Sequence, residues 1–207
     1  MDGETSRKTV LIASAGCAVG GELAERFAAT GALVVVVDHA ERRALALARR
    51  MPRNIESLTL DCLRPGQCRR LGEIWGDTPL DLLVHLHPLR SPRRLGAAVA
   101  AIPALTRALM DGLAQGEGLV LVGCRAAGRD ARPEVRAFDA ALAALAPHMQ
   151  AEAGSNARVN VLRLGPHTGR TALIHEARRF AEGARDGARG AVINLAGAGD
   201  VTRTQGD

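Results

Sequence analysis

A run of small and β-branched residues at positions 32–37 ends at Asp38 and follows an earlier apolar run at 9–13. Between these runs, residues 22–29 place apolar side chains at helical spacing, and Gly31 stands where a helix would end. Uninterrupted β-branched runs are typical of parallel strands that are covered on both faces. The first 38 residues therefore predict a βαβ unit.

The same alternation continues along the chain. Further strands are expected at 57–60, 81–86, 118–123, 158–164 and 190–195, and further helices at about 40–50, 66–75, 95–113, 133–153 and 173–184. This order predicts an α/β fold, a doubly wound parallel sheet (Rossmann-like) of about seven strands with helices on both faces. No linker divides the sequence, so we expect one domain over 1–207, with flexible tails at 1–8 and 200–207.

The composition excludes several kinds of chemistry. The chain has no tyrosine, and Lys8 is its single lysine. It therefore offers no phenol as an acid and no plausible Schiff-base or Walker-type lysine. The apolar runs are far shorter than the ~20 residues that cross a bilayer, so we expect a cytoplasmic protein without membrane contact. The net charge of +5 is spread without a basic block, so no nucleic-acid partner is expected.

In open α/β sheets, ligands bind at the carboxyl ends of the strands, so the residues there carry the functional information. Four segments stand out, in this order: 10–20 (VLIASAGCAVG), 81–88 (DLLVHLHP), 158–166 (RVNVLRLGP) and 190–197 (GAVINLAG). Together with Asp38 and with Asp61 after the third strand, they resemble the short-chain dehydrogenase/reductase family over nearly the whole chain.

The resemblance implies an NAD site after the first strand. In the family's glycine-rich turn, Ser14 and Ala18 replace the first two glycines and only Gly20 is kept. A methyl group at Ala18 would intrude where the backbone must approach the pyrophosphate. Asp38 and Asp61 still suit the adenosine half, although a solvated strand end is an alternative interpretation of Asp38. We therefore expect no cofactor, with NAD bound at most weakly.

The resemblance also implies a catalytic tyrosine, lysine, serine and asparagine. Phe138 stands at the tyrosine position, Leu142 at the lysine position, Cys124 at the serine position and Ala98 near the asparagine position. None of these four side chains can protonate a carbonyl or tune an acid for that step. The sequence therefore predicts no catalytic residue, as in a pseudoenzyme.

Other groupings leave two interpretations open. His85 and His87 point to one side of a strand end and can begin a metal site, but no third ligand is linked to them, so no metal is expected. Cys124 is either a nucleophile beside Arg125 or a buried structural thiol. A cationic segment faces either a phosphate or acidic partner or only solvent; it comprises Arg125, Arg129, Arg132 and Arg136.

Helices at 95–113 and 133–153 are rich in alanine and permit close packing. In the family this pair of helices forms the contact between subunits. The leading hypothesis is an inactive subunit that forms a hetero-oligomer with a catalytic short-chain dehydrogenase through these helices, or otherwise a homo-oligomer. The alternatives are an NAD or metabolite sensor without turnover, and an NAD-dependent oxidoreductase with relocated catalytic groups.

Overall fold

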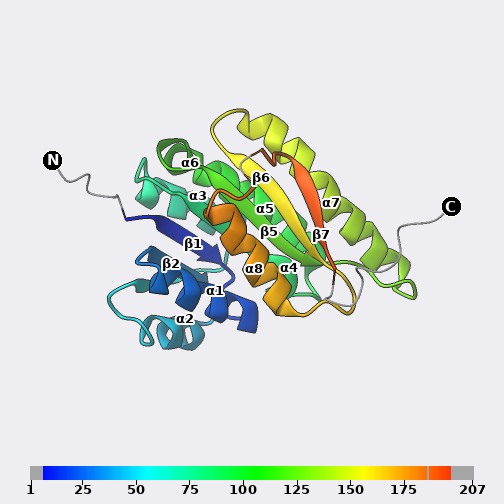
Figure 1. Ribbon diagram of the computed structural model, residues 1–207, viewed down its shortest axis with the longest axis horizontal. Helices are drawn as coiled ribbons and strands as arrows, with labels where there is room; N and C mark the ends of the chain where they lie inside the picture. The colour runs from blue at the N-terminus through cyan, green and yellow to red at the C-terminus, as the bar shows by residue number, and fades with distance from the viewer. Residues whose placement is uncertain (1–6, 186, 197–207) are drawn as a thin grey trace.

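The computed structural model describes residues 7–185 and 187–196 (Figure 1). Within them, seven strands form one parallel sheet in the order β3-β2-β1-β4-β5-β6-β7. The strands are β1 (Thr9–Ala13), β2 (Leu33–Asp38), β3 (Ile55–Thr59), β4 (Leu82–His85), β5 (Leu119–Arg125), β6 (Arg158–Leu164) and β7 (Ala191–Leu195). The predicted doubly wound parallel sheet is confirmed.

Eight helices connect these strands in the described part of the chain. They are α1 (Ala18–Ala29), α2 (Glu41–Ala48), α3 (Pro65–Trp75), α4 (His87–Arg90), α5 (Leu95–Ala108), α6 (Met110–Gln115), α7 (Pro133–Ala153) and α8 (Arg170–Ala181). The short α4 was not predicted, and the helix expected at 95–113 is two helices that meet at Leu109.

The break at Leu109 lets α6 turn toward the segment before β4. The Gly112 carbonyl accepts the Leu80 N–H at 2.9 Å. A Cβ atom at Gly112 would lie 2.6 Å from the Thr78 carbonyl oxygen, so only glycine allows this approach. A contact between segments that are distant in sequence therefore ends α5 early.

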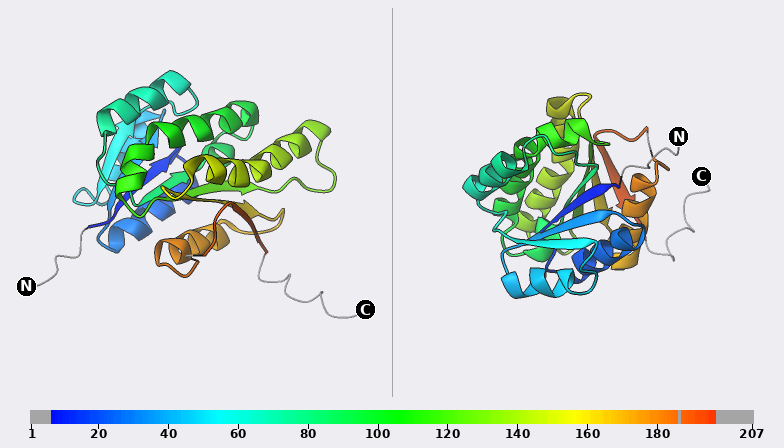
Figure 2. Two further views of the ribbon diagram at one scale, coloured as in Figure 1. Left: turned by 90° about the horizontal axis from the view of Figure 1, so that it is seen from above. Right: turned by 90° about the vertical axis from the view of Figure 1, so that its left-hand side faces the viewer.

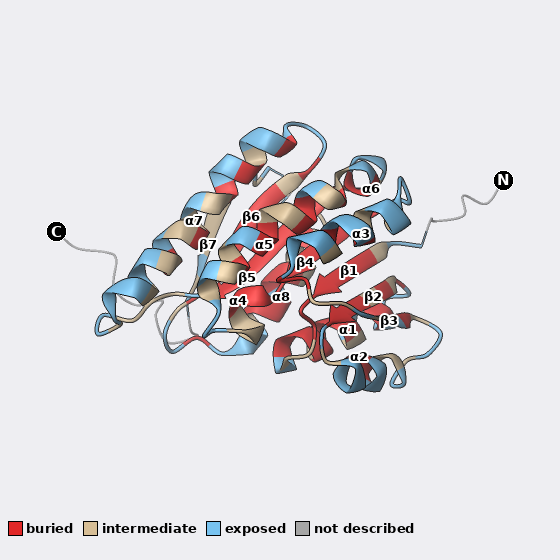
Figure 3. Cartoon of the chain, turned by 180° about the vertical axis from the view of Figure 1, so that it is seen from behind, coloured by how far each residue is buried: buried red, intermediate tan, exposed pale blue. Residues whose placement is uncertain are grey.

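The helices form a layer on each face of the sheet (Figure 2). Helices α1, α2 and α8 contribute side chains such as Phe27, Leu47 and Phe180 to one apolar cluster. The other cluster includes Leu71 of α3 and Leu142 of α7, with α5 and α6. The strands between these layers are buried, apart from the edges of the sheet (Figure 3). The core is almost entirely aliphatic, because the chain has few aromatic residues.

Strand order reverses at β1, which has β2 on one side and β4 on the other. In doubly wound sheets the crevice for a ligand opens at this switch point, above the carboxyl ends of the strands. The turns after β1, β2 and β4 therefore frame the candidate site.

The predicted tails lie mostly outside the described residues. Within the tail expected at 1–8, Arg7 donates hydrogen bonds to the carbonyls of Gly31 and Arg53, and Lys8 pairs with Glu117. Across the described ranges, no helix combines the length and the hydropathy required to cross a membrane.

Candidate functional site

The turn after β1 has the backbone shape of a glycine-rich turn although its first glycine position is a serine. Ser14 has φ 61° and is the one non-glycine residue with positive φ in the described ranges. An added Cβ at Gly20 would lie 2.3 Å from the Ala15 carbonyl oxygen, so α1 packs against the turn only with glycine there. The shape of the turn is therefore kept at a cost in strain at Ser14.

Ala18, the second substituted position, is the first residue of α1 and is exposed. It lines an open cavity of about 670 Å³ between the turn, α1 and α2. Arg43 of α2 reaches the same turn, where its Nη1 donates to the Gly16 carbonyl at 3.0 Å. The methyl group of Ala18 thus faces open space, and the turn is accessible from this side.

Asp38 is not a solvated strand end: its side chain is 0% exposed. Its Oδ2 accepts the Gly16 N–H at 2.8 Å, and its Oδ1 accepts the Ala40 N–H at 2.9 Å. Arg90 of α4 donates Nε to Oδ2 at 3.1 Å and Nη2 to Oδ1 at 3.3 Å. Burial alone would raise the pKa of Asp38, but the hydrogen bonds from Arg90, Ala40 and Gly16 outweigh it and lower that pKa.

Asp61 follows β3 and is half-buried. Its Oδ1 accepts the Leu63 N–H at 3.1 Å, and its Oδ2 lies 3.3 Å from Arg64 Nε. The preceding residue, Leu60, donates its N–H to the Asp38 carbonyl at 3.1 Å, so Asp61 lies at the carboxyl ends of the strands beside β2. The structure therefore brings Asp38 and Asp61 to the edge where the resemblance puts the adenosine half.

His85 and His87 are fully buried neighbours whose ring centroids are 5.3 Å apart. His85 Nε2 bonds Thr106 Oγ1 at 2.9 Å, whereas His85 Nδ1 and both ring nitrogens of His87 have no hydrogen-bond partner. Burial lowers the pKa of His85 well below its usual value and that of His87 to about 4. Both rings are therefore neutral near pH 7. In the described part of the chain, no three or more His, Cys, Asp or Glu side chains gather around a common point as metal ligands.

Cys124 lies near the carboxyl end of β5 and is 1% exposed. Burial, reinforced by the nearby Asp139 carboxylate, raises the pKa of its thiol to about 12. Asp139 of α7 accepts the Ala127 N–H at 3.0 Å and forms an ion pair with Arg163 of β6. Arg163 also donates to Asn194 Oδ1 at 3.2 Å. This ion pair, beside a protonated thiol, occupies the ends of β5 and β6.

The other three positions taken from the resemblance carry apolar side chains, of which Leu142 and Ala98 are buried and Phe138 is half-buried. Phe138 contacts α5, where its ring lies 3.4 Å from a Cβ built at Gly96. Leu142 is 2% exposed in the same cluster as Cys124, and Ala98 of α5 is fully buried in a small cluster with Ala101 and Leu63. None of them presents a polar atom to the crevice.

The cationic segment after β5 is bound mostly to the protein itself. Arg125 donates to the carbonyls of Gly165 and Pro166, and Arg136 donates to the Arg129 carbonyl. Arg132 lies 3.1 Å from Glu134. Arg125, which the sequence suggested as the cation beside Cys124, points toward the loop after β6. The cation that acts on the pKa of the Cys124 thiol is Arg163.

Three charged residues of this edge were missed from the sequence: Arg90, Asp139 and Arg163. Arg163 carried a signal, because it stands between two buried leucines of a strand, Leu162 and Leu164, and a charge there needs a partner. For Arg90 and Asp139 the sequence contained no such signal. Arg90 meets Asp38, and Asp139 meets Arg163, only because the order of strands in the sheet brings distant segments together.

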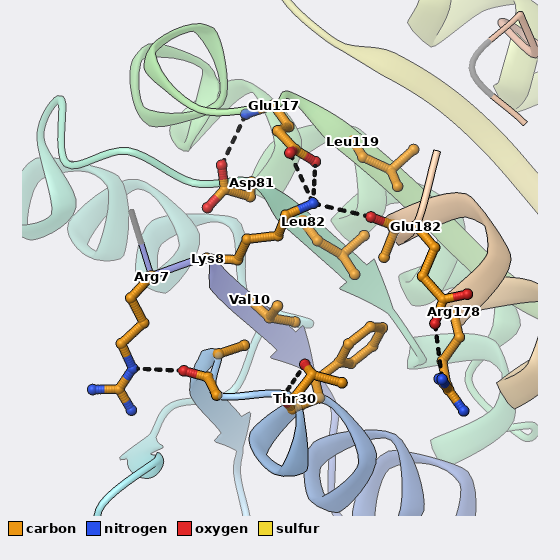
Figure 4. Close-up of a pocket in the computed structure, with 14 residues that line it drawn as sticks. Arg7, Lys8, Val10, Thr30, Asp81, Leu82, Glu117, Leu119, Arg178 and Glu182 are labelled. Atoms are coloured by element: carbon orange, nitrogen blue, oxygen red, sulfur yellow. Dashed lines mark hydrogen bonds and ion pairs between the residues drawn. The ribbon is translucent and has the colours of Figure 1, made fainter. Parts of the chain in front are cut away.

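A second cavity, of about 610 Å³, lies at the amino ends of β1, β4 and β5, between α1 and α8 (Figure 4). Its floor is a row of residues paired across β1, β4 and β5: Val10, Leu82 and Leu119. At its rim, Lys8 Nζ donates to Glu117 Oε2 at 2.9 Å, and Arg178 lies 2.8 Å from Glu182 (Figure 4). None of the site residues predicted from the sequence lines this cavity.

No known family model matches the sequence, and no curated relative matches it. Solved structures do match. A short-chain dehydrogenase/reductase, glucose/ribitol dehydrogenase, from Brucella melitensis is 16% identical, with a TM-score of 0.76 over 92% of this chain and 95% of that chain. A short-chain dehydrogenase from Mycobacterium smegmatis is 19% identical, with a TM-score of 0.71 over 93% of each chain.

A third structure corrects one expectation. The 3-ketoacyl-(acyl-carrier-protein) reductase of Brucella melitensis, complexed with NADH, is 21% identical, with a TM-score of 0.73 over 92% of this chain and 97% of that chain. The expectation of no cofactor is therefore wrong as an inference from the sequence, because a protein of this fold holds a dinucleotide. That expectation rested on the substitutions at Ser14 and Ala18, and the backbone of the turn keeps its shape despite the serine. The chain has the fold of the short-chain dehydrogenases/reductases.

Proposed function

We propose that this chain is a member of the short-chain dehydrogenase/reductase family that performs no carbonyl reduction itself and assembles with a catalytically complete relative. The observation that carries the proposal is the chemistry at the ends of β5 and β6. Carbonyl reduction needs a proton donor whose pKa lies near the working pH. The Cys124 thiol has a pKa raised to about 12, and Asp139 is an ion-paired carboxylate with a lowered pKa.

Arg163 does not supply the missing acid, because its bond to Asp139 raises the pKa of its guanidinium further. The ion pair ties α7 to β6 and β7 through Asp139, Arg163 and Asn194. The place of an acid is thus taken by a group that stabilises the fold. This arrangement favours a structural role over turnover.

The surface proposed for assembly is the outer side of α5 and α7. Ala137, Ala140 and Ala144 of α7 are exposed, and Ala141 is half-buried. Small side chains on one face allow a second helix to approach closely. Arg107 of α5 and Glu152 of α7 form an ion pair that holds the two helices together. Such a face suits a contact that buries roughly 1,200–2,000 Å² in total.

The test is co-expression with a tyrosine-containing short-chain dehydrogenase encoded beside this chain, followed by size-exclusion chromatography. We expect the two proteins to co-elute, and we expect Ala144→Arg to separate them because a buried unpaired charge is costly. The matched control is Ala46→Arg, an exposed alanine on α2 at the other face of the sheet. If the partner still co-elutes with Ala144→Arg, the proposed surface is wrong.

A second assay tests the absence of turnover. The isolated chain is incubated with NADH or NADPH and a panel of ketones and aldehydes, and cofactor oxidation is followed by absorbance. We expect no oxidation above a blank without protein. Turnover that disappears in Cys124→Ala would contradict the proposal and favour an enzyme with relocated chemistry.

A second candidate function is a nucleotide-responsive subunit without turnover. The retained shape of the turn at Ser14 and Gly20 favours it, because this backbone is what approaches a pyrophosphate in such folds. A shift of the melting temperature with NADH in the assembled complex would support this candidate.

A further inference from the structure

We propose that Arg90 determines access to the crevice at the switch point, and that a dinucleotide must displace the Arg90 guanidinium from Asp38 before its ribose can bind that carboxylate. An acidic side chain at the end of the second strand is what hydrogen-bonds the adenosine ribose in doubly wound dinucleotide folds. In this protein, that side chain already has a full set of partners.

The Asp38 carboxylate has about four acceptor positions, two on each oxygen. Oδ2 receives the Gly16 N–H and Arg90 Nε, and Oδ1 receives the Ala40 N–H and Arg90 Nη2. All four positions are occupied, and the side chain is 0% exposed. A ribose hydroxyl therefore has no free position on Asp38 while these bonds are made.

Arg90 crosses the crevice to make its two bonds. It belongs to α4, directly after β4, whereas Asp38 ends β2, and β1 lies between these two strands. Arg90 Nε and the Gly16 N–H bond the same oxygen, Asp38 Oδ2, so the guanidinium lies close to the turn after β1. Only 14% of the Arg90 side chain is exposed, so it closes this part of the crevice.

Of the four bonds to Asp38, the two from Arg90 are the ones that can be released. The Gly16 N–H belongs to the turn after β1, and the Ala40 N–H belongs to the residue that precedes α2, so both amides are fixed by the backbone. Arg90 is a long side chain at the last position of a four-residue helix, and a rotamer change can move its guanidinium into solvent. Ribose hydroxyls would then donate to the positions it leaves, so each lost hydrogen bond is replaced.

The test compares NADH binding to the full-length wild type and to Arg90→Met by isothermal titration calorimetry. If the open state is populated at about 10% or less, removing Arg90 tightens the dissociation constant about ten-fold or more. Electrostatics alone predicts the opposite, because removing a cation weakens the binding of an anionic ligand. An unchanged or weaker affinity in Arg90→Met, or no binding to either protein at millimolar NADH, would overturn the proposal.

The matched control is Arg43→Met, which removes an arginine that contacts the same turn through the Gly16 carbonyl but not Asp38. Its NADH affinity is expected to stay the same or to weaken; tightening equal to that of Arg90→Met would show a general effect of charge and overturn the proposal. Arg90→Lys serves if Arg90→Met does not fold, because lysine keeps the charge but cannot make the paired bonds. It is expected to tighten binding by a smaller factor, and no tightening would count against the proposal.

The double variant Arg90→Met/Asp38→Asn tests whether the tighter NADH binding expected for Arg90→Met depends on the Asp38 carboxylate. We expect it to lose most of the tightening, because the neutral amide is a poorer acceptor for two ribose hydroxyls. Full retention of the gain would show that Asp38 is not the group released. These binding outcomes are independent of co-elution with a partner, so they do not decide the proposed function.

Discussion

Asp139 of α7 and Arg163 of β6 form an ion pair between a helix and the sheet, directly beside the Cys124 thiol. Only 9% of the Asp139 side chain and 28% of the Arg163 side chain is exposed. Asp139 also accepts the Ala127 N–H, and Arg163 also reaches Asn194 of β7. The pair therefore joins α7, β6, β7 and the loop after β5 at the carboxyl ends of the strands.

Replacing one partner of this pair should destabilise the protein strongly. Arg163→Met leaves the Asp139 carboxylate buried with the Ala127 N–H as its remaining donor. Breaking a buried pair costs about 3–5 kcal/mol, and the partial exposure of Arg163 reduces the expected loss to about 2–3 kcal/mol in the free energy of unfolding. Urea denaturation measures it.

The control is Arg26→Met, which removes an exposed pair with Glu22 within α1. That pair is expected to contribute little to the free energy of unfolding, because solvent screens exposed pairs. Equal losses in the two variants would show that the pair between Asp139 and Arg163 has no special role in stability.

The order of strands and helices could be predicted because each buried strand is a local apolar run. The ends of the elements were predicted less well: the strand expected at 57–60 is Ile55–Thr59, with a mixed burial pattern, and the helix expected at 173–184 is Arg170–Ala181. The break at Leu109 could not be predicted, because it depends on the contact between Gly112 and Thr78, which only the tertiary structure creates.

The candidate site was predictable in part, for the same reason. The turn from Ser14 to Gly20 and the strand end at Asp38 are local features, and the structure places them together. Arg90 is 52 residues from Asp38, and Arg163 is 24 residues from Asp139, so neither ion pair is visible as a local pattern. The expectation about the cofactor failed because it judged side-chain identity at Ser14 and Ala18, whereas the backbone conformation decides the shape of the turn.

The four cysteines should differ sharply in reactivity. Cys17 is half-exposed, whereas Cys62, Cys68 and Cys124 are at most 3% exposed. Burial raises the pKa of the Cys17 thiol as well as that of Cys68, to about 11, and that of Cys124, to about 12, so access of the reagent is what distinguishes Cys17. We expect iodoacetamide to label one thiol of the native protein and four thiols after unfolding, as counted by mass spectrometry.

Cys17→Ser is the control for this experiment, and it should abolish labelling of the native protein. Modification of native Cys124 at a rate similar to that of Cys17 would contradict the buried position of its thiol. It would also reopen the interpretation of Cys124 as a nucleophile.

The strain at Ser14 predicts a stabilising substitution. A residue with a Cβ at φ 61° costs about 1–2 kcal/mol relative to ordinary backbone, and glycine avoids most of that cost. After the greater freedom of glycine in the unfolded chain is subtracted, Ser14→Gly should raise the free energy of unfolding by about 0.5–1 kcal/mol. Ser57→Gly, within strand β3, should lower it by a similar amount. A loss of stability in Ser14→Gly would show that the side chain contributes more than the strain.

His85 and His87 should make stability depend on pH between about pH 6.5 and pH 4. Burial lowers the pKa of both rings, to about 4 for His87, whereas histidines in the unfolded chain have a pKa of about 6.5. As the pH falls through this window, the two histidines take up protons in the unfolded chain but not in the folded chain, so the free energy of unfolding decreases. His87 alone should lower the free energy of unfolding by about 3 kcal/mol between pH 7 and pH 4.

The lowered pKa values of Asp38 and Asp139 act in a separate pH range, because the stability that these carboxylates contribute is lost only below about pH 4. Urea denaturation at pH 7.5, 6 and 5 should therefore show a steep decline in the wild type and a shallow one in His85→Asn/His87→Leu, and equal slopes would show that these rings are protonated in the folded protein.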